Sequence, residues 1–191
     1  MDKSKWRAVY RKKRAELTES QRTDLAKKIG TQLSSVLTSS DRFIHLFLPI
    51  EKFNEVNTWL VKETVENQFS GINWLVSSTD FTEEKLLHFY LEKDTKIAIN
   101  AFGIPEPVNA KGTDIKQLTT VLVPLLAIDK NGHRLGYGKG FYDRFLAECP
   151  KNCRTIGLSF FEPEETTFPT DSWDIPLQYC VTPNGVHSFI K

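Results

Sequence analysis

Residues 120–148 read Thr-Val-Leu-Val-Pro-Leu-Leu-Ala-Ile-Asp-Lys-Asn-Gly-His-Arg-Leu-Gly-Tyr-Gly-Lys-Gly-Phe-Tyr-Asp-Arg-Phe-Leu-Ala-Glu, and this stretch decides the fold. The run 120–126 is almost wholly apolar, which is typical of a central strand in a parallel sheet. A glycine-rich loop follows, and the pattern of 141–148 predicts a helix that begins directly after the last glycine. The succession of strand, loop and helix indicates an α/β protein.

The flanking segments continue the alternation of helices and short apolar strands. Thr18 and Gln21 form a capping box for a helix on which Leu25, Ile29 and Leu33 recur at helical spacing. The remaining expected elements are a basic helix over 3–17, a helix capped by Asn57, and strands over 43–48, 72–76, 86–91, 154–159 and 178–182. Residues 95–102 favour neither helix nor strand, 105–112 are expected to form a loop, and 183–191 are expected to form a C-terminal tail. We therefore predict a single three-layer α/β domain over 1–191, with a mostly parallel central sheet flanked by helices.

Composition excludes several classes of protein. The chain has 191 residues, 40% of them hydrophobic and 26% charged, and its formal net charge is +1. That charge gives no general attraction to nucleic acid or to membranes, and no apolar run approaches the length of a membrane span. The basic N-terminus does not resemble a signal peptide, and the three cysteines lack metal-ligand spacing. We expect a cytoplasmic monomer with reduced thiols that binds neither nucleic acid nor membrane.

The loop over 134–143 predicts a phosphate site. Gly136, Gly138 and Gly140 allow the backbone to approach a ligand closely, and Arg134 and Lys139 add two positive charges. A helix N-terminus just beyond the last glycine favours negative charge as well. The spacing matches neither a Walker A loop nor the dinucleotide fingerprint, and a plain turn between a strand and a helix remains the alternative.

The N-terminal helix places Lys3, Arg7 and Arg14 on roughly one face. Such a face can clamp a polyphosphate. Two alternatives are a solvated surface, which most runs of charge are, and an arm that binds nucleic acid.

The stretch from Arg134 to Arg144 closely resembles the signature of the 5-formyltetrahydrofolate cyclo-ligase family, whose members are also called 5,10-methenyltetrahydrofolate synthetases. Four further segments are similar to family elements in the same order, so that the resemblance spans nearly the whole chain. These are Lys3-Ser4-Lys5-Trp6-Arg7, Glu55-Val56-Asn57-Thr58, Gly103-Ile104-Pro105-Glu106-Pro107 and Trp173-Asp174-Ile175-Pro176-Leu177. The chain departs from the family pattern in a longer segment between Leu48 and Glu55, in Asn57 and in Gln178.

The resemblance implies roles for individual residues. Lys139 and Arg134 would be catalytic, with Lys139 contacting the transferred phosphoryl group, and Asp143 and Asp174 would hold Mg²⁺. The folate would contact Leu48, Glu55, Tyr137, Gly138, Lys139, Gly140 and Phe141. ATP would contact Lys3, Ser4, Lys5, Trp6, Arg7, Arg14, Arg134, Leu135, Gly136, Tyr137, Gly138, Lys139, Gly140, Phe141 and Tyr142.

The resemblance also implies the reaction, which is the ATP-dependent closure of 5-formyltetrahydrofolate to 5,10-methenyltetrahydrofolate with release of ADP and phosphate. Taken without the resemblance, the residues leave three other classes open. A nucleotide-binding module would need the glycine loop but no folate pocket. A nucleic-acid-binding protein would use the basic helix, and a related α/β enzyme could act on sugar phosphates or CoA esters.

Overall fold

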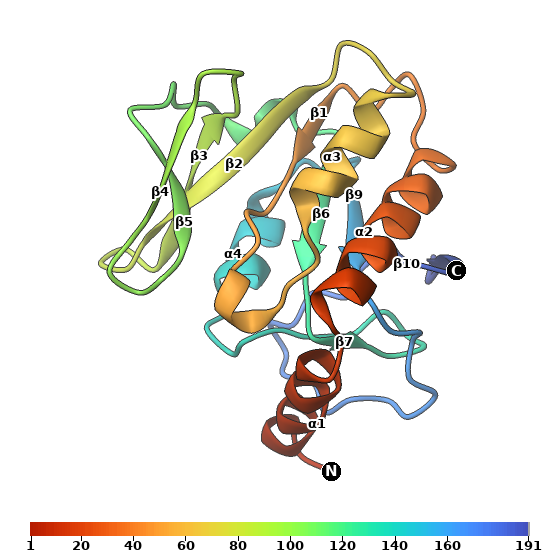
Figure 1. Ribbon diagram of the computed structural model, residues 1–191. Coiled ribbons are helices and arrows are strands. Elements are labelled where there is room, and N and C mark those ends of the chain that lie inside the picture. Colours follow the sequence, from red (N-terminus) through yellow and green to blue (C-terminus); the bar gives the residue numbers. More distant parts are fainter. Residues whose placement is uncertain (191) are drawn as a thin grey trace.

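The structure is a computed structural model, and it describes residues 1–190 (Figure 1). Its helices are α1 (Lys3–Ala15), α2 (Glu19–Ser34), α3 (Thr58–Glu66) and α4 (Phe141–Glu148), with short 3₁₀ turns η1 (Glu51–Phe53) and η2 (Ile115–Gln117). The strands are β1 (Phe43–His45), β2 (Asn73–Asp80), β3 (Lys85–Tyr90), β4 (Lys96–Ile99), β5 (Pro105–Val108), β6 (Thr120–Pro124), β7 (Ala127–Ile128), β8 (Arg134–Leu135), β9 (Arg154–Leu158), β10 (Tyr179–Thr182) and β11 (Gly185–Ser188).

Seven strands form the central sheet in the order β11-β10-β9-β6-β1-β2-β3. The four inner pairings, from β10 through β9, β6 and β1 to β2, are parallel, and the two outer pairings are antiparallel. The expected α/β architecture with a mostly parallel sheet is therefore confirmed. As predicted, the run that begins at Thr120 supplies a central strand whose first four residues are buried.

Helices cover both faces of this sheet. Side chains alternate between the two faces of a strand, and Leu122 on β6 joins the core cluster beneath α2 and α3. Its neighbours Val121 and Val123 join the opposite cluster, which contains Phe145 and Leu146 of α4. The three layers thus follow from alternating apolar positions on one strand, and Figure 1 shows α2 and α3 together on one side of the sheet.

Local sequence explains where the helices begin. Thr18 Oγ1 accepts the Gln21 N–H and Gln21 Oε1 accepts the Thr18 N–H, so the predicted capping box of α2 is confirmed. Asn57 caps α3 by accepting main-chain N–H groups through its side-chain oxygen, also as predicted. Capping of this kind satisfies donors that have no partner within the helix.

The loop expected over 105–112 and the tail expected over 183–191 were wrong, whereas the sequence of 95–102 favours neither helix nor strand. The segments 95–102 and 105–112 contain β4 and β5, which pair as an antiparallel hairpin beside β2. The expected tail from 183 forms β11 over its described part, pairing antiparallel with β10, while Lys191 lies outside the described residues. Pro105 and Pro107 discouraged a strand assignment, because proline cannot donate to a ladder, but they lie on a two-stranded sheet where such a donor can be missing.

The carboxyl ends of the parallel strands meet at one edge, where ligand sites of open α/β sheets lie. The loops after β1, β6 and β9 leave from this edge, and α1 lies across it (Figure 1). Within residues 1–190, the structure contains no helix that is both long enough and apolar enough to span a membrane.

Candidate active site

The glycine loop leads directly into the N-terminus of α4. Gly138 and Gly140 have φ of 89° and 71°, in the left-handed region that glycine adopts without a Cβ penalty. Gly140 is the N-cap residue of α4, and it offers no side chain to the first N–H groups of that helix. These N–H groups, together with the helix dipole, form an anion-binding position.

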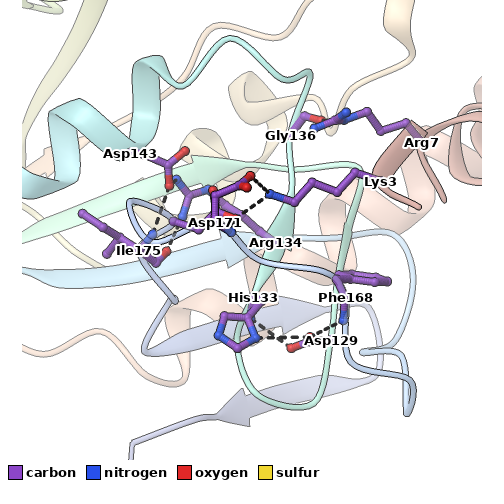
Figure 2. A network of polar contacts seen from close by, with 11 residues as sticks. Lys3, Arg7, Asp129, His133, Arg134, Gly136, Asp143, Phe168, Asp171 and Ile175 are labelled. Carbon is purple, nitrogen blue, oxygen red and sulfur yellow. Dashed lines mark hydrogen bonds and ion pairs between the residues drawn. The ribbon is translucent and has the colours of Figure 1, made fainter. Parts of the chain in front are cut away.

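Helix α1 packs its cationic face against the glycine loop. Arg7 donates through Nε to the Gly136 carbonyl at 2.9 Å, as Figure 2 shows. A Cβ at Gly138 would lie 3.2 Å from the Arg7 guanidinium, so the absence of a side chain there permits the close approach. The expected clustering of the basic helix with the loop is thus present, although 129 residues separate Arg7 from Gly136.

Arg14 is the buried member of that face, with only 2% of its surface exposed. Its Nη2 donates to the Leu125 carbonyl at 2.6 Å, and its Nη1 donates to the Tyr137 hydroxyl at 3.1 Å. Arg14 therefore joins α1 to the carboxyl end of β6 and to the glycine loop.

Arg134 forms the other end of the loop. Its Nη2 lies 2.7 Å from Asp143 Oδ1 and its Nη1 donates to the Ile175 carbonyl at 2.6 Å. Asp143 Oδ1 also accepts the Ile175 N–H at 3.1 Å. Burial lowers the pKa of Arg134 and the nearby Asp143 carboxylate raises it, with a net lowering. Figure 2 shows the guanidinium held between the helix and the segment that contains Ile175.

Lys3 bridges two aspartates on that same segment. Its Nζ lies 2.5 Å from Asp171 Oδ2 and 2.6 Å from Asp174 Oδ2. Burial alone would raise the pKa of Asp174, but the hydrogen bonds from Lys3 and from the Asp171 N–H outweigh it and lower that pKa. The sequence indicated Asp174 but not Asp171. Only the position of Asp171, three residues before Asp174, could have suggested it.

The two residues expected to hold Mg²⁺, Asp143 and Asp174, both lie near Arg134. Each already has a cationic partner, Arg134 and Lys3 respectively. Among residues 1–190, no three His, Cys, Asp or Glu side chains form a cluster that could bind a metal ion. Magnesium commonly uses only one or two carboxylates and takes its other ligands from phosphates and water, so this donor set fits that ion only together with a phosphorylated ligand.

Glu55 lines a small pocket at the same edge of the sheet. It is 8% exposed, and its Oε2 accepts the Ile50 N–H at 2.7 Å. The pocket is lined by Arg14, Phe47, Glu55, Val56, Pro124, Leu125 and Leu158. Burial raises the pKa of Glu55, against the opposing effects of the Ile50 N–H, Tyr137 and Arg14. Leu48, which was expected in the substrate pocket, is buried in the core cluster under α2 and α3.

Aromatic side chains that sequence reasoning did not single out lie beside the loop. Phe53 of η1 stacks on Tyr137 with ring centroids 4.9 Å apart. The ring centroid of Phe81 lies 4.5 Å from that of Phe102 and 5.9 Å from that of Phe141. Phe81 and Phe102 are 42% and 59% exposed, so they form an open aromatic patch next to the start of α4. No sequence pattern marked it, because its members come from three separate elements.

The remaining expected ATP contacts occupy different environments. Lys139 is exposed at the tip of the loop, and Ser4 and Lys5 are exposed on α1. Trp6 packs on Phe168, with ring centroids 5.1 Å apart. The Leu135 side chain is buried in the core, and Tyr142 packs against the clusters on both faces of the sheet.

Comparison with known proteins identifies the family. A model of the "5-formyltetrahydrofolate cyclo-ligase family" matches residues 1–183. The chain belongs to the 5-formyltetrahydrofolate cyclo-ligase family. A 5-formyltetrahydrofolate cyclo-ligase of Haemophilus influenzae is 32% identical over 174 residues, which cover 90% of this chain and 92% of that protein.

Solved structures of family members have the same fold. A 5,10-methenyltetrahydrofolate synthetase of Aquifex aeolicus superimposes with a TM-score of 0.82 at 28% identity, covering 100% of this chain and 94% of that one. A synthetase of Mycoplasma pneumoniae gives a TM-score of 0.70 at 22% identity, covering 96% and 99%, and supports the fold. The resemblance read from the glycine-loop signature is thus confirmed at the level of the family.

Proposed function

We propose that this protein converts 5-formyltetrahydrofolate to 5,10-methenyltetrahydrofolate with consumption of ATP, releasing ADP and phosphate. Family membership supports the reaction. The observation in the structure that supports it best is the placement of Arg7 and Arg134 at the two sides of a glycine loop that ends at an uncapped helix N-terminus. Lys3 of α1 is paired with Asp171 and Asp174 on the neighbouring segment.

These groups suit the triphosphate of ATP. The N–H groups of 136–140 and of the first turn of α4 would bind phosphate oxygens, and Arg7 and Lys3 would bind them from α1. Lys139 and Arg134 would act on the transferred phosphoryl group, because phosphoryl transfer depends chiefly on positioning and on neutralisation of charge. Ser4, Lys5 and Trp6 would border the nucleotide from the start of α1, where Ser4 and Lys5 are exposed to solvent.

Asp143 and Asp174 would hold Mg²⁺ once phosphate oxygens complete its ligand shell. The ion would neutralise negative charge on the phosphates. Binding would require each aspartate to exchange its present cation for the metal, while Arg134 and Lys3 turn to the phosphates. The ion pairs of the free protein would therefore keep both sets of groups in place for MgATP.

The folate would bind between Glu55 and the glycine loop. A carboxylate has two acceptor oxygens and can therefore bind adjacent N–H groups of a pterin. Tyr137 within the loop and Phe141 at its end would pack on such a ligand by their aromatic faces. One face of Tyr137 is already stacked on Phe53. Leu48 is buried in the core cluster and would contact the folate from there.

The chemistry follows from the weakness of the formyl group as an electrophile. Transfer of the γ-phosphoryl group to the formyl oxygen turns that oxygen into part of a leaving group. N10 then attacks the formyl carbon within the same molecule, and phosphate departs with the former formyl oxygen. The protein must hold the two reactants in line and exclude water. Holding reactants in the correct geometry can itself give a large increase in rate.

The fate of the formyl oxygen tests this route. With substrate labelled by ¹⁸O in the formyl group, mass spectrometry should find the label in the released phosphate. Label that appears in water instead would contradict phosphorylation of the formyl oxygen. ATP binding by calorimetry without any turnover would favour a nucleotide-binding module.

We also propose a single cytoplasmic domain that acts as a monomer. The three cysteines, Cys149, Cys153 and Cys180, are all free thiols. Free thiols suit a reducing compartment.

A further inference from the structure

Asp129 is a fully buried carboxylate. The reaction described above assigns it no role. Asp129 follows β7 and has 0% of its surface exposed. Its Oδ1 accepts the N–H groups of Asn131 at 2.8 Å and of His133 at 3.0 Å. Its Oδ2 accepts the Phe168 N–H at 2.8 Å and lies 3.3 Å from Nδ1 of His133. Both oxygens of a charged side chain are thus engaged in the interior, where loss of a partner is costly.

The two oxygens bind two different segments. Oδ1 holds the turn of the β7–β8 hairpin, and Arg134 is the next residue after His133. Oδ2 holds the main chain at Phe168, in the segment that continues to Asp171 and Asp174. Figure 2 shows Asp129 between these segments, below the Arg134 and Lys3 contacts.

Main-chain hydrogen bonds hold the segments together on either side of Asp129. Lys130 donates to the Glu164 carbonyl at 2.9 Å, and Leu177 donates to the Gly132 carbonyl at 2.9 Å. Gly132 has φ of 83°, and a Cβ there would lie 2.5 Å from the Leu177 carbonyl oxygen. The hairpin therefore fits against the 160–177 segment only with this tight turn, which the Asp129 carboxylate stabilises from within.

We propose that Asp129 is a positioning residue for phosphoryl transfer, an inference that rests on the proposed function. It fixes the hairpin carrying Arg134 relative to the segment carrying Asp171 and Asp174. Because Arg134 also binds Ile175 of that segment and Asp143 of α4, a displacement of the hairpin moves a catalytic guanidinium. Asp129 contacts neither reactant and acts through Arg134.

An asparagine at position 129 would keep the shape but lose one acceptor. Its amide NH₂ would face N–H donors from one of the two segments. The chain offers a matched control in Asp41, which is 4% exposed and accepts hydrogen bonds from Thr38, Thr120 and Arg154. Asp41 precedes β1 and therefore lies at the opposite edge of the sheet.

The test compares wild type, Asp129→Asn and Asp41→Asn by urea unfolding and by product formation at a temperature where all three are folded. We expect both variants to lose stability. Asp129→Asn should lose about 10- to 100-fold in kcat and show a raised KM for ATP, with the KM for the folate unchanged. Asp41→Asn should stay within about twofold of wild type in kcat, in KM for ATP and in KM for the folate. A loss of fold alone would lower kcat and leave both KM values unchanged.

A folded Asp129→Asn variant with wild-type kcat and wild-type KM for ATP would overturn the proposal, as would equal losses of kcat in both variants. If Asp129→Asn does not fold, His133→Phe serves as the second variant. It removes only the contact between the His133 ring and Asp129 Oδ2, and it should still lower kcat by about threefold or more. Unchanged kcat in that variant would then overturn it. An inactive wild type would contradict the proposed function itself, and the role of Asp129 in it would fall at the same time.

Discussion

The guanidinium of Arg134 and the carboxylate of Asp143 join the two ends of the glycine loop, with Nη2 2.7 Å from Oδ1. Arg134 lies on β8 before the first glycine, and Asp143 lies in the first turn of α4 after the last. The loop is therefore closed by an ion pair across its base before any ligand binds. Preorganisation of this kind lowers the free-energy cost of binding and of reaction.

Replacing Asp143 by asparagine should raise the Mg²⁺ concentration that the enzyme needs for activity. The change keeps the shape of the side chain and removes a negative charge that the metal would need. We expect the Mg²⁺ concentration for half-maximal rate to rise by about tenfold or more. Initial rates over a series of Mg²⁺ concentrations measure this, with Asp24→Asn on the exposed face of α2 as the control. An unchanged Mg²⁺ dependence would contradict the proposal that Asp143 binds the metal.

Replacing Lys139 by methionine should remove most of kcat. Lys139 is exposed at the loop, so its loss should leave stability nearly unchanged. We expect a loss on the order of 3 kcal/mol of transition-state stabilisation, or about two orders of magnitude in rate. Steady-state kinetics on Lys139→Met and on Lys151→Met, an exposed lysine after α4, measure it. Near-normal turnover in Lys139→Met would contradict the assignment.

Replacing Arg14 by methionine should reduce stability as well as activity. Arg14 is buried and donates to the Leu125 carbonyl and to the Tyr137 hydroxyl, and it offsets the buried Glu55 charge. Removing one partner of a group of buried, interacting charges lowers the free energy of unfolding by about 3 kcal/mol. Urea unfolding measures the loss, with Arg11→Met on the exposed side of α1 as the control. Equal unfolding midpoints for the two variants would show that the buried contacts contribute little.

Two buried histidines should make stability depend on pH. His45 and His88 pack against Phe145 of α4, and both His45 ring nitrogens and Nδ1 of His88 lack a hydrogen-bond partner among the described residues. Burial lowers the pKa of His45 well below its usual 6.5, with a further contribution from His88, and burial lowers the pKa of His88 to about 4.

The sign of the effect follows from these directions. The unfolded chain binds protons at these histidines as the pH falls below 6.5, whereas the folded protein does not until about pH 4 for His88. The contribution to stability is therefore complete above pH 6.5 and is lost as the pH falls below 6.5, by up to about 1.4 kcal/mol per pH unit for each histidine. For His88 the loss ends at about pH 4. Glu55 acts in the opposite direction, because burial raises its pKa. Urea unfolding from about pH 7.5 to about pH 4.5, which covers most of that range, should show a shallower slope in a His45→Phe, His88→Phe double variant. Equal slopes would contradict the prediction.

Much of the fold was predictable because its signals are local. The apolar run at 120–126, the Thr18–Gln21 capping box and the Asn57 cap each lie within a few residues of the element they specify. The strand over 43–48 was overextended, since β1 ends at His45 while the buried residues continue beyond it. An apolar run records burial and does not record where ladder pairing stops.

The candidate site was predictable where one stretch of sequence contains it. The glycine loop and the first turn of α4 are such a stretch. Asp171, Phe53 and Asp129 were assigned no role because their partners, Lys3, Tyr137 and Phe168, lie far away in sequence. Long-range pairs of this kind appear only when the sheet brings its loops to one edge.

Product formation by the wild-type protein is the decisive test of the cyclo-ligase assignment. The protein is mixed with 5-formyltetrahydrofolate, MgATP and neutral buffer, and the near-ultraviolet absorbance of the methenyl product is followed. We expect a band that requires both ATP and Mg²⁺, with one ADP released for each product. Absence of the band in a folded protein that binds ATP would contradict the cyclo-ligase assignment and leave only a nucleotide-binding loop.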